Sequence, residues 1–242
     1  MNSFSYLEYK NILSKFKSSI VDYSEVNGLE EYTCLRHDVE FNVDRALEMA
    51  KIDAKFGIKS SFLFQVRSGA YNILSIANRK KIYEIIELDC NVGLHFYVTH
   101  IQEGAWDVLE QELSLQMDIF EAALDIKCDR FSYHRPPKWV LEDRSDYLLG
   151  IINTYGESFF EYSPNPQSIK YMADSRHRFD YGHPLDTHDY KKFQLLFHPD
   201  EWSIEGGDEV NNFRKLEKEH LEKFYVTLNS ETKNYVCIKE IE

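Results

Sequence analysis

The feature that most constrains the fold is a series of short apolar runs that each end in polar residues able to bind a metal or move a proton. The first run, Leu35–Glu40 (LRHDVE), ends in an imidazole and two carboxylates. Four later runs end in the same way, at Gly93-Leu94-His95, Tyr133-His134-Arg135-Pro136-Pro137, Ala173-Asp174-Ser175 and Phe197-His198-Pro199 with Trp202 close behind. Five such ends in series indicate one assembled catalytic site.

Strand-like runs alternate with segments of helical periodicity. The expected strands are Tyr32–Arg36, Ser60–Val66, Asn91–Leu94, Phe131–Tyr133, Lys170–Ala173, Phe193–Phe197 and Tyr235–Ile238. The expected helices are Val43–Phe56, Lys80–Leu88, a long amphipathic helix marked by apolar residues from Trp106 to Leu124, and Glu209–Leu228. This order predicts an α/β fold with a mainly parallel sheet. In such sheets the functional groups come from the carboxyl ends of the strands, which is where the polar residues lie.

Length and composition predict one catalytic domain over residues 1–242. The chain has no repeat and no linker-like tract, and 43% of its 242 residues are hydrophobic, which is enough for a sizeable core. The net charge of −13 argues against a nucleic-acid partner or a polybasic membrane anchor. No apolar window is long enough for a membrane span, and the N-terminus does not read as a signal peptide, so we expect a cytoplasmic protein. Four scattered cysteines without CxxC spacing predict buried free thiols.

The first and second polar ends predict a metal site. Asp38 and Glu40 are two positions apart, so in an extended segment they point to the same side. Glu40 and His95 are the expected ligands, and His100 is the candidate for a third. One carboxylate and two imidazoles with an open position suit a hydrolytic divalent ion such as zinc.

The remaining groups predict acid–base chemistry. Asp38 is the candidate general base, with Arg135 holding it ionised. His198 is the candidate acid for the leaving group, and Asp174 the carboxylate that sets its tautomer. Taken singly, each of these residues also fits a helix cap, a turn, a surface ion pair or a structural histidine. Two more histidines, His37 and His134, flank the site residues and could line the site.

These motifs resemble the polysaccharide deacetylase (NodB-homology) family, and within it the intracellular branch with a His-Asp-Val-Asp-type first motif. The resemblance covers about Thr33 to Trp202. It implies a distorted (β/α)7 barrel. It also implies a base and a metal ligand in the first motif, metal histidines in the second, Arg-Pro-Pro in the third, an acid in the fourth and Leu-x-x-His-Pro in the fifth. On this chain they fall, in order, at Asp38, Glu40, His95 with His100, Arg135–Pro137, Asp174 and Leu195–Pro199.

Two positions depart from the family pattern. Glu40 stands where the family has Asp, which adds one methylene between backbone and ligand. The second family histidine follows the first by four residues, where this chain has Thr99, and His100 is five residues away.

The resemblance and the residues together predict a metal-dependent hydrolase of non-peptide C–N amide bonds. The expected substrate is an N-acylated amino sugar in a cytoplasmic surface-polysaccharide precursor. Two alternatives stay open at this point. One is an amidohydrolase of a small cyclic amide or ureide, and the other is a non-catalytic carbohydrate-binding protein with a decayed metal site.

Overall fold

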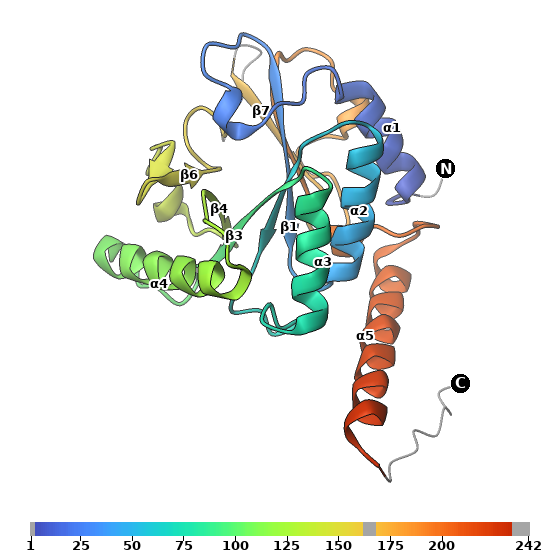
Figure 1. Ribbon diagram of the computed structural model, residues 1–242. Helices are drawn as coiled ribbons and strands as arrows, with labels where there is room; N and C mark the ends of the chain where they lie inside the picture. The colour runs from blue at the N-terminus through green and yellow to red at the C-terminus, as the bar shows by residue number, and fades with distance from the viewer. Residues whose placement is uncertain (1–2, 162–167, 234–242) are drawn as a thin grey trace.

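A curled eight-stranded sheet forms the centre of the molecule in the computed structural model, which describes residues 3–161 and 168–233 (Figure 1). Its strand order is β5-β6-β4-β3-β2-β1-β8-β7. The strands are β1 (Tyr32–Val39), β2 (Ser61–Phe64), β3 (Asn91–Tyr97), β4 (Arg130–His134), β5 (Tyr147–Leu148), β6 (Ile151–Asn153), β7 (Ile169–Ala173) and β8 (Lys192–Phe197). All neighbours pair in parallel except β5 and β6. The sheet is a half-barrel, so the expected α/β fold with a mainly parallel, distorted barrel is confirmed.

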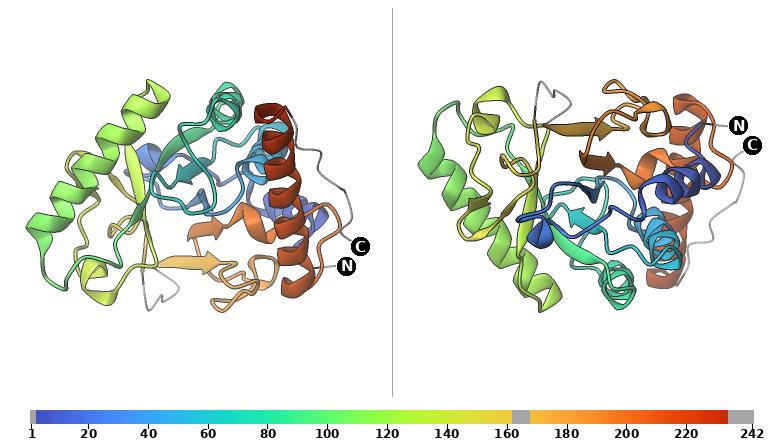
Figure 2. Two further views of the ribbon diagram at one scale, coloured as in Figure 1. Left: turned by 90° about the horizontal axis from the view of Figure 1, so that it is seen from below. Right: turned by 90° about the horizontal axis from the view of Figure 1, so that it is seen from above.

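Helices lie outside the curve of the sheet, as the views from below and from above show (Figure 2). They are α1 (Tyr6–Phe16), α2 (Val43–Lys55), α3 (Ile76–Glu87), α4 (Trp106–Leu124) and α5 (Glu209–Glu231). Side-chain oxygens of Ser5, Asn42, Ser75 and Asp208 accept hydrogen bonds from first-turn N–H groups and so fix where four of these helices begin. Short 3-10 helices cover Tyr23–Glu25, Lys138–Leu141, Pro184–Asp186 and Pro199–Glu201.

Six of the seven expected strands and all four expected helices are present, with moved ends. Strand β1 continues to Val39 and β3 continues to Tyr97, so that His95 lies inside its strand. The sequence reading did not include α1, β5 or β6. The expected strand Tyr235–Ile238 lies outside the described residues.

Strand alternation separates the packed face of the sheet from the inner one. In β1, Leu35 and Val39 join the main apolar core, while Arg36 bonds to Thr154 and Tyr155 inside the curve of the sheet. Between β3 and β4 the backbones approach so closely that a Cβ on Gly93 would lie 2.5 Å from the carbonyl oxygen of Arg130. Only glycine fits there, and the close pairing sets His95 directly opposite Ser132.

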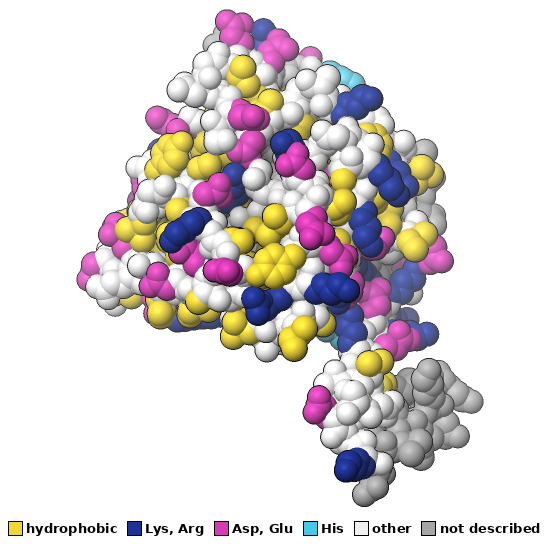
Figure 3. Space-filling model, in the orientation of Figure 1, with side chains coloured by type: hydrophobic (Ala, Val, Ile, Leu, Met, Phe, Trp, Pro, Cys, Tyr) yellow, Lys and Arg dark blue, Asp and Glu magenta, His cyan; other side chains and the backbone are white. Residues whose placement is uncertain are grey.

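Three of the four cysteines are buried and free, as expected: Cys34, Cys90 and Cys128. Cys237 lies outside the described residues. Acidic, basic and apolar side chains are interspersed over the face shown in Figure 3, and α5 extends away from the body with only Asn212 and Leu216 buried. Among residues 3–161 and 168–233, no helix combines the length and apolar character needed to cross a bilayer.

Candidate active site

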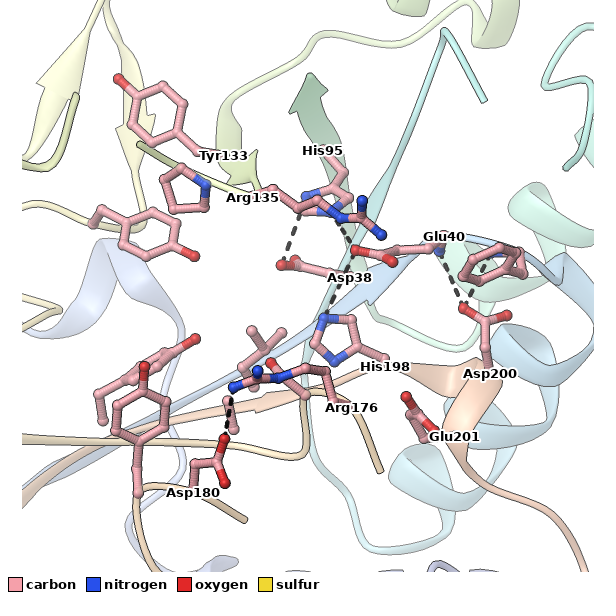
Figure 4. A pocket seen from close by; sticks show the side chains of 18 of the residues that line it. Asp38, Glu40, His95, Tyr133, Arg135, Arg176, Asp180, His198, Asp200 and Glu201 are labelled. Carbon is pink, nitrogen blue, oxygen red and sulfur yellow. Dashed lines mark hydrogen bonds and ion pairs between the residues drawn. The ribbon is translucent and has the colours of Figure 1, made fainter. Parts of the chain in front are cut away.

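The carboxyl ends of five strands meet around one cavity of about 640 Å³. Residues from β1, β3, β4, β7 and β8, or from the positions that follow them, line it, as Figure 4 shows. They include Asp38, Glu40, His95, Arg135 and His198. Parallel pairing brings these groups together although they are spread over 161 positions of sequence, from 38 to 198.

Three side chains place their ligand atoms within reach of a single ion. They are Glu40, His95 and His134, and their oxygen and nitrogen atoms all lie within 4.8 Å of one another. Glu40 Oε1 is 3.3 Å from His95 Nε2 and 2.8 Å from His134 Nδ1. The two ring nitrogens are 3.1 Å apart. The three atoms therefore converge on one point at the carboxyl-terminal edge of the sheet.

The hydrogen bonds around His95 fix which of its nitrogens faces that point. The Ser132 hydroxyl donates to Asp38 Oδ1 at 3.0 Å, so its oxygen accepts from His95 Nδ1 at 2.7 Å. With the proton on Nδ1, the lone pair of Nε2 points toward Glu40 and His134. Metal-binding histidines characteristically donate their second N–H to a fixed acceptor in this way.

The Glu40 carboxylate is held from two sides. Close contacts with the His134 and His95 rings and the charge of His198 outweigh burial and lower the pKa of Glu40 well below its usual range. Asp200 Oδ2 accepts from the backbone N–H groups of Glu40 at 3.2 Å and Phe41 at 3.1 Å, which fixes the backbone of this ligand. Burial, together with the charge of Glu40, raises the pKa of Asp200 to about 7.

Asp38 is a buried carboxylate whose cationic partner comes from its own strand. Arg36 Nη2 lies 3.5 Å from Asp38 Oδ2, and both side chains are almost fully buried. Arg36 also donates to Tyr155 Oη at 2.8 Å and to the Thr154 hydroxyl. The carboxylate is thus oriented toward the cavity between a guanidinium and the hydroxyl of Ser132.

His198 and Asp174 form a second pair on the other side of the cavity. His198 Nδ1 is 2.6 Å from Asp174 Oδ1, and Asp174 Oδ2 accepts from Trp202 Nε1 at 2.6 Å. Burial alone would lower the pKa of His198, but the charge and hydrogen bond of Asp174, with the charge of Glu40, raise it to about 10. The other nitrogen, Nε2, faces the cavity 3.9 Å from Glu40 Oε1.

The structure brings five of the seven expected site residues together and places two of them elsewhere than expected. His100 stacks on Tyr97, lies 4.0 Å from Glu112 and is 44% exposed, so it is outside the Glu40 group. His134 occupies the third position instead, because it ends β4 beside β3. Arg135 lines the cavity but does not pair with Asp38, where Arg36 stands.

Sequence signals existed for both substitutes. His134 ends an apolar run, as His95 does, and the reading treated it only as a residue flanking the site. Arg36 is two positions before Asp38 and therefore on the same face of the strand. Ser132 and Asp200 had no such signal, because their roles depend on which strands are neighbours.

Comparisons with known proteins return structural likenesses only. No protein-family model and no curated protein matches this sequence. The structure of BA3943, described as a CE4 family pseudoenzyme from Bacillus anthracis, is 15% identical, with a TM-score of 0.44 over 80% of this chain and 62% of that one. The Streptococcus pyogenes deacetylase PplD in complex with acetate is 17% identical, with a TM-score of 0.41 over 55% of this chain and 65% of that one. A family 4 carbohydrate esterase from Bacillus anthracis is 14% identical, with a TM-score of 0.41 over 90% and 86%.

The chain thus spans less than two thirds of BA3943 and PplD. At these identities and TM-scores, the likenesses carry no argument about what this chain does.

Proposed function

We propose that this chain is a divalent-metal-dependent hydrolase that removes the acyl group from an N-acylated amino sugar. One observation carries the proposal. Glu40, His95 and His134 converge on one point, and a candidate base, Asp38, and a candidate acid, His198, line the same cavity. A carboxylate and two imidazoles with an open position are the donor set of hydrolytic zinc sites.

The donor spacing supports the assignment of an ion here. Ligands about 2.0–2.1 Å from a tetrahedral ion are separated from each other by roughly 3.3 Å. The distances of 3.3, 3.1 and 2.8 Å among the three donor atoms are close to this value or slightly shorter. A small outward shift of Glu40, which is the most exposed of the three, completes the fit. The additional methylene of Glu40 gives its carboxylate the reach to meet His134.

The protein groups divide the proton transfers between two sides of the cavity. When bound, a divalent ion supplies Lewis acidity that polarises the acyl carbonyl. Asp38, held by Arg36 and Ser132, accepts the proton of the attacking water. His198, kept protonated by Asp174, donates a proton from Nε2 to the departing amine. A carboxylate that can accept a proton and a protonated imidazole facing one cavity are the pair that amide hydrolysis requires.

The substrate class follows from the shape and lining of the cavity together with the motif resemblance. A volume of about 640 Å³ is in the range of small-ligand sites. Tyr133, Tyr155, Phe160, Tyr171 and Tyr181 line it. These five aromatic rings offer apolar faces and the four tyrosines among them also offer hydroxyl groups for hydrogen bonds, which suits a sugar ring. A precursor of a surface polysaccharide in the cytoplasm is the source we propose for this substrate.

Metal content tests the proposal most directly, with two histidine variants as a matched pair. Purified protein saturated with zinc and then dialysed should hold about one ion per chain by elemental analysis. His134→Ala and His95→Ala should each lose most of it, because each ligand is a large share of a small coordination shell. His100→Ala, the same change outside the group, should keep it.

Full zinc content in His134→Ala would contradict the ligand assignment. The zinc-loaded protein should also release carboxylate from acylated amino sugars. If the protein bound zinc but hydrolysed none of the acylated amino sugars, the metal site would stand and the proposed substrate class would be overturned. If the protein bound no metal and turned over none of these substrates, the result would favour a decayed site.

A further inference from the structure

Arg135 stands at the cavity with no role in the chemistry described so far. Its side chain is exposed and lines the cavity, and it makes no hydrogen bond, ion pair or cation–π contact within residues 3–161 and 168–233. The carboxylate it was expected to hold, Asp38, is already paired with Arg36 and bonded to Ser132. Arg135 is therefore free to meet a group from outside the chain.

The backbone conformation at Arg135 is unusual and restricts where its side chain can lie. Arg135 has φ +49°, in the left-handed region that non-glycine residues rarely occupy, and Pro136 and Pro137 follow it. Six other non-glycine residues of the described chain also have positive φ, so the conformation alone does not mark a site, but at this position it sets the direction in which the side chain leaves the end of β4. In Figure 4 the side chain extends from the end of β4 across the group of Asp38, Glu40 and His95.

The charge balance of the cavity indicates which external group fits. Six of its lining residues are Asp or Glu, and the other rim arginine, Arg176, already has an acidic partner in Asp180 at 2.8 Å, which Arg178 shares at 3.0 Å. In a chain with 41 acidic and 28 basic residues, Arg135 has no acidic partner among the described residues, although carboxylates line the same cavity. A guanidinium fork binds phosphate and carboxylate groups through two parallel hydrogen bonds.

We propose that Arg135 binds an anionic group, a phosphate or a carboxylate, on the acylated sugar, and that this group selects the substrate. The proposal rests on the proposed function and narrows its substrate class from neutral acyl amino sugars to charged ones. In this arrangement Arg36 keeps Asp38 in position, and Arg135 contacts the substrate.

Three probes that share one acyl amino group test this. N-acetylglucosamine is neutral, N-acetylglucosamine 1-phosphate carries a phosphate and N-acetylmuramic acid carries a carboxylate. Binding is measured by calorimetry at low salt on zinc-loaded Asp38→Asn protein, in which the loss of the candidate base keeps the probes intact during the measurement. At least one anionic probe should bind about tenfold or more tightly than the neutral one, and the better of the two identifies the anion.

Arg135→Gln should abolish that preference and leave the affinity for the neutral sugar unchanged. Arg176→Gln removes the same charge from the same rim, but from a guanidinium already paired with Asp180, so it should change the preference far less. The preference should also shrink as salt is raised.

The proposal is overturned if neither anionic probe binds better than the neutral sugar, or if the preference survives in Arg135→Gln. Equal weakening of all three probes would also overturn it, because Arg135 would then act on the acyl amide that they share. Failure of the proposed function reads differently, since it would show as absent zinc or absent acyl release whatever the binding preference.

Discussion

Two histidine–aspartate pairs in this molecule look alike in a contact list and differ in everything that decides function. His37 Nε2 lies 3.0 Å from Asp53 Oδ2, and His198 Nδ1 lies 2.6 Å from Asp174 Oδ1. The first pair is fully buried between β1 and α2, where Asp53 also accepts from the hydroxyls of Tyr9 and Ser60. The second pair opens into the cavity.

The difference lies in what the remaining nitrogen can reach. The ring of His37 stacks on Phe62 at 4.2 Å, and the pair is closed off by helices and sheet. His198 keeps Nε2 free, 3.9 Å from Glu40 Oε1 at the cavity. Whether a histidine beside an aspartate is closed off in the core or reaches the cavity therefore depends on which face of the sheet it is on. His37 and Asp38 show this directly, because adjacent residues of β1 belong to the two different sites.

The largest contrast is expected in turnover. Asp38→Asn should lower the hydrolysis rate by about 10² to 10⁴, the range for a lost general base. Asparagine keeps the shape and can still accept from Ser132, but Arg36 loses its carboxylate partner, so some stability is lost as well. The rate is measured on zinc-loaded protein at a temperature where circular dichroism shows it folded. Near-full activity in this variant would mean that another group is the base.

The buried pair should instead register in stability. In the native chain the hydroxyls of Tyr9 and Ser60 donate hydrogen bonds to the Asp53 carboxylate. In Asp53→Asn one of these acceptor oxygens is replaced by an NH₂ group, which is itself a donor. The expected loss is about 2–4 kcal/mol in the free energy of unfolding, measured by urea denaturation. The rate per folded molecule should change little. A rate loss as large as that of Asp38→Asn, without unfolding, would remove the distinction between the two pairs.

The fold could be predicted from the sequence because the hydrophobic periodicity of each element and the order of the elements are both visible in it. Strand-like runs alternate with helical periods, and a polar group follows each of five runs, which is enough to expect a parallel sheet with its site at one edge. Sequence reasoning did not find β5 and β6, which have two and three residues and carry little pattern. Short strands depend on their neighbours for pairing, and the sequence does not show those neighbours.

The sequence could predict which strands bring residues to the candidate site, but not which side chains contact each other there. Asp38, Glu40, His95, Asp174 and His198 all reach the site region because each lies in the carboxyl-terminal part of a strand or directly after it. His100 was expected as a second imidazole shortly after His95 in the chain, and Arg135 was expected beside Asp38 because of the Arg-Pro-Pro motif. In the structure the deciding neighbours are across the sheet, where β4 delivers His134, or two residues back, where Arg36 shares a face with Asp38.

The smallest expected effect, and the finest test of the comparison, is the titration of His198 in metal-free protein. Asp174 and Glu40 raise its pKa to about 10, so the ring should stay protonated through neutral pH and lose its proton only in the alkaline range. Because the folded pKa is above the unfolded value of about 6.5, the stability from this pair is fully present below pH 6.5. It is lost as the pH rises through 10.

Asp174→Asn removes the largest of the influences that raise this pKa, so the imidazole signal followed by NMR should titrate at lower pH than in the unmodified chain. Asp53→Asn, the same substitution at the closed pair, should leave the His198 titration where it was, because Asp53 is on the other face of the sheet. An unmoved His198 signal in Asp174→Asn would show that the 2.6 Å contact does not control the acid. The two pairs would then differ in access alone and not in electrostatics.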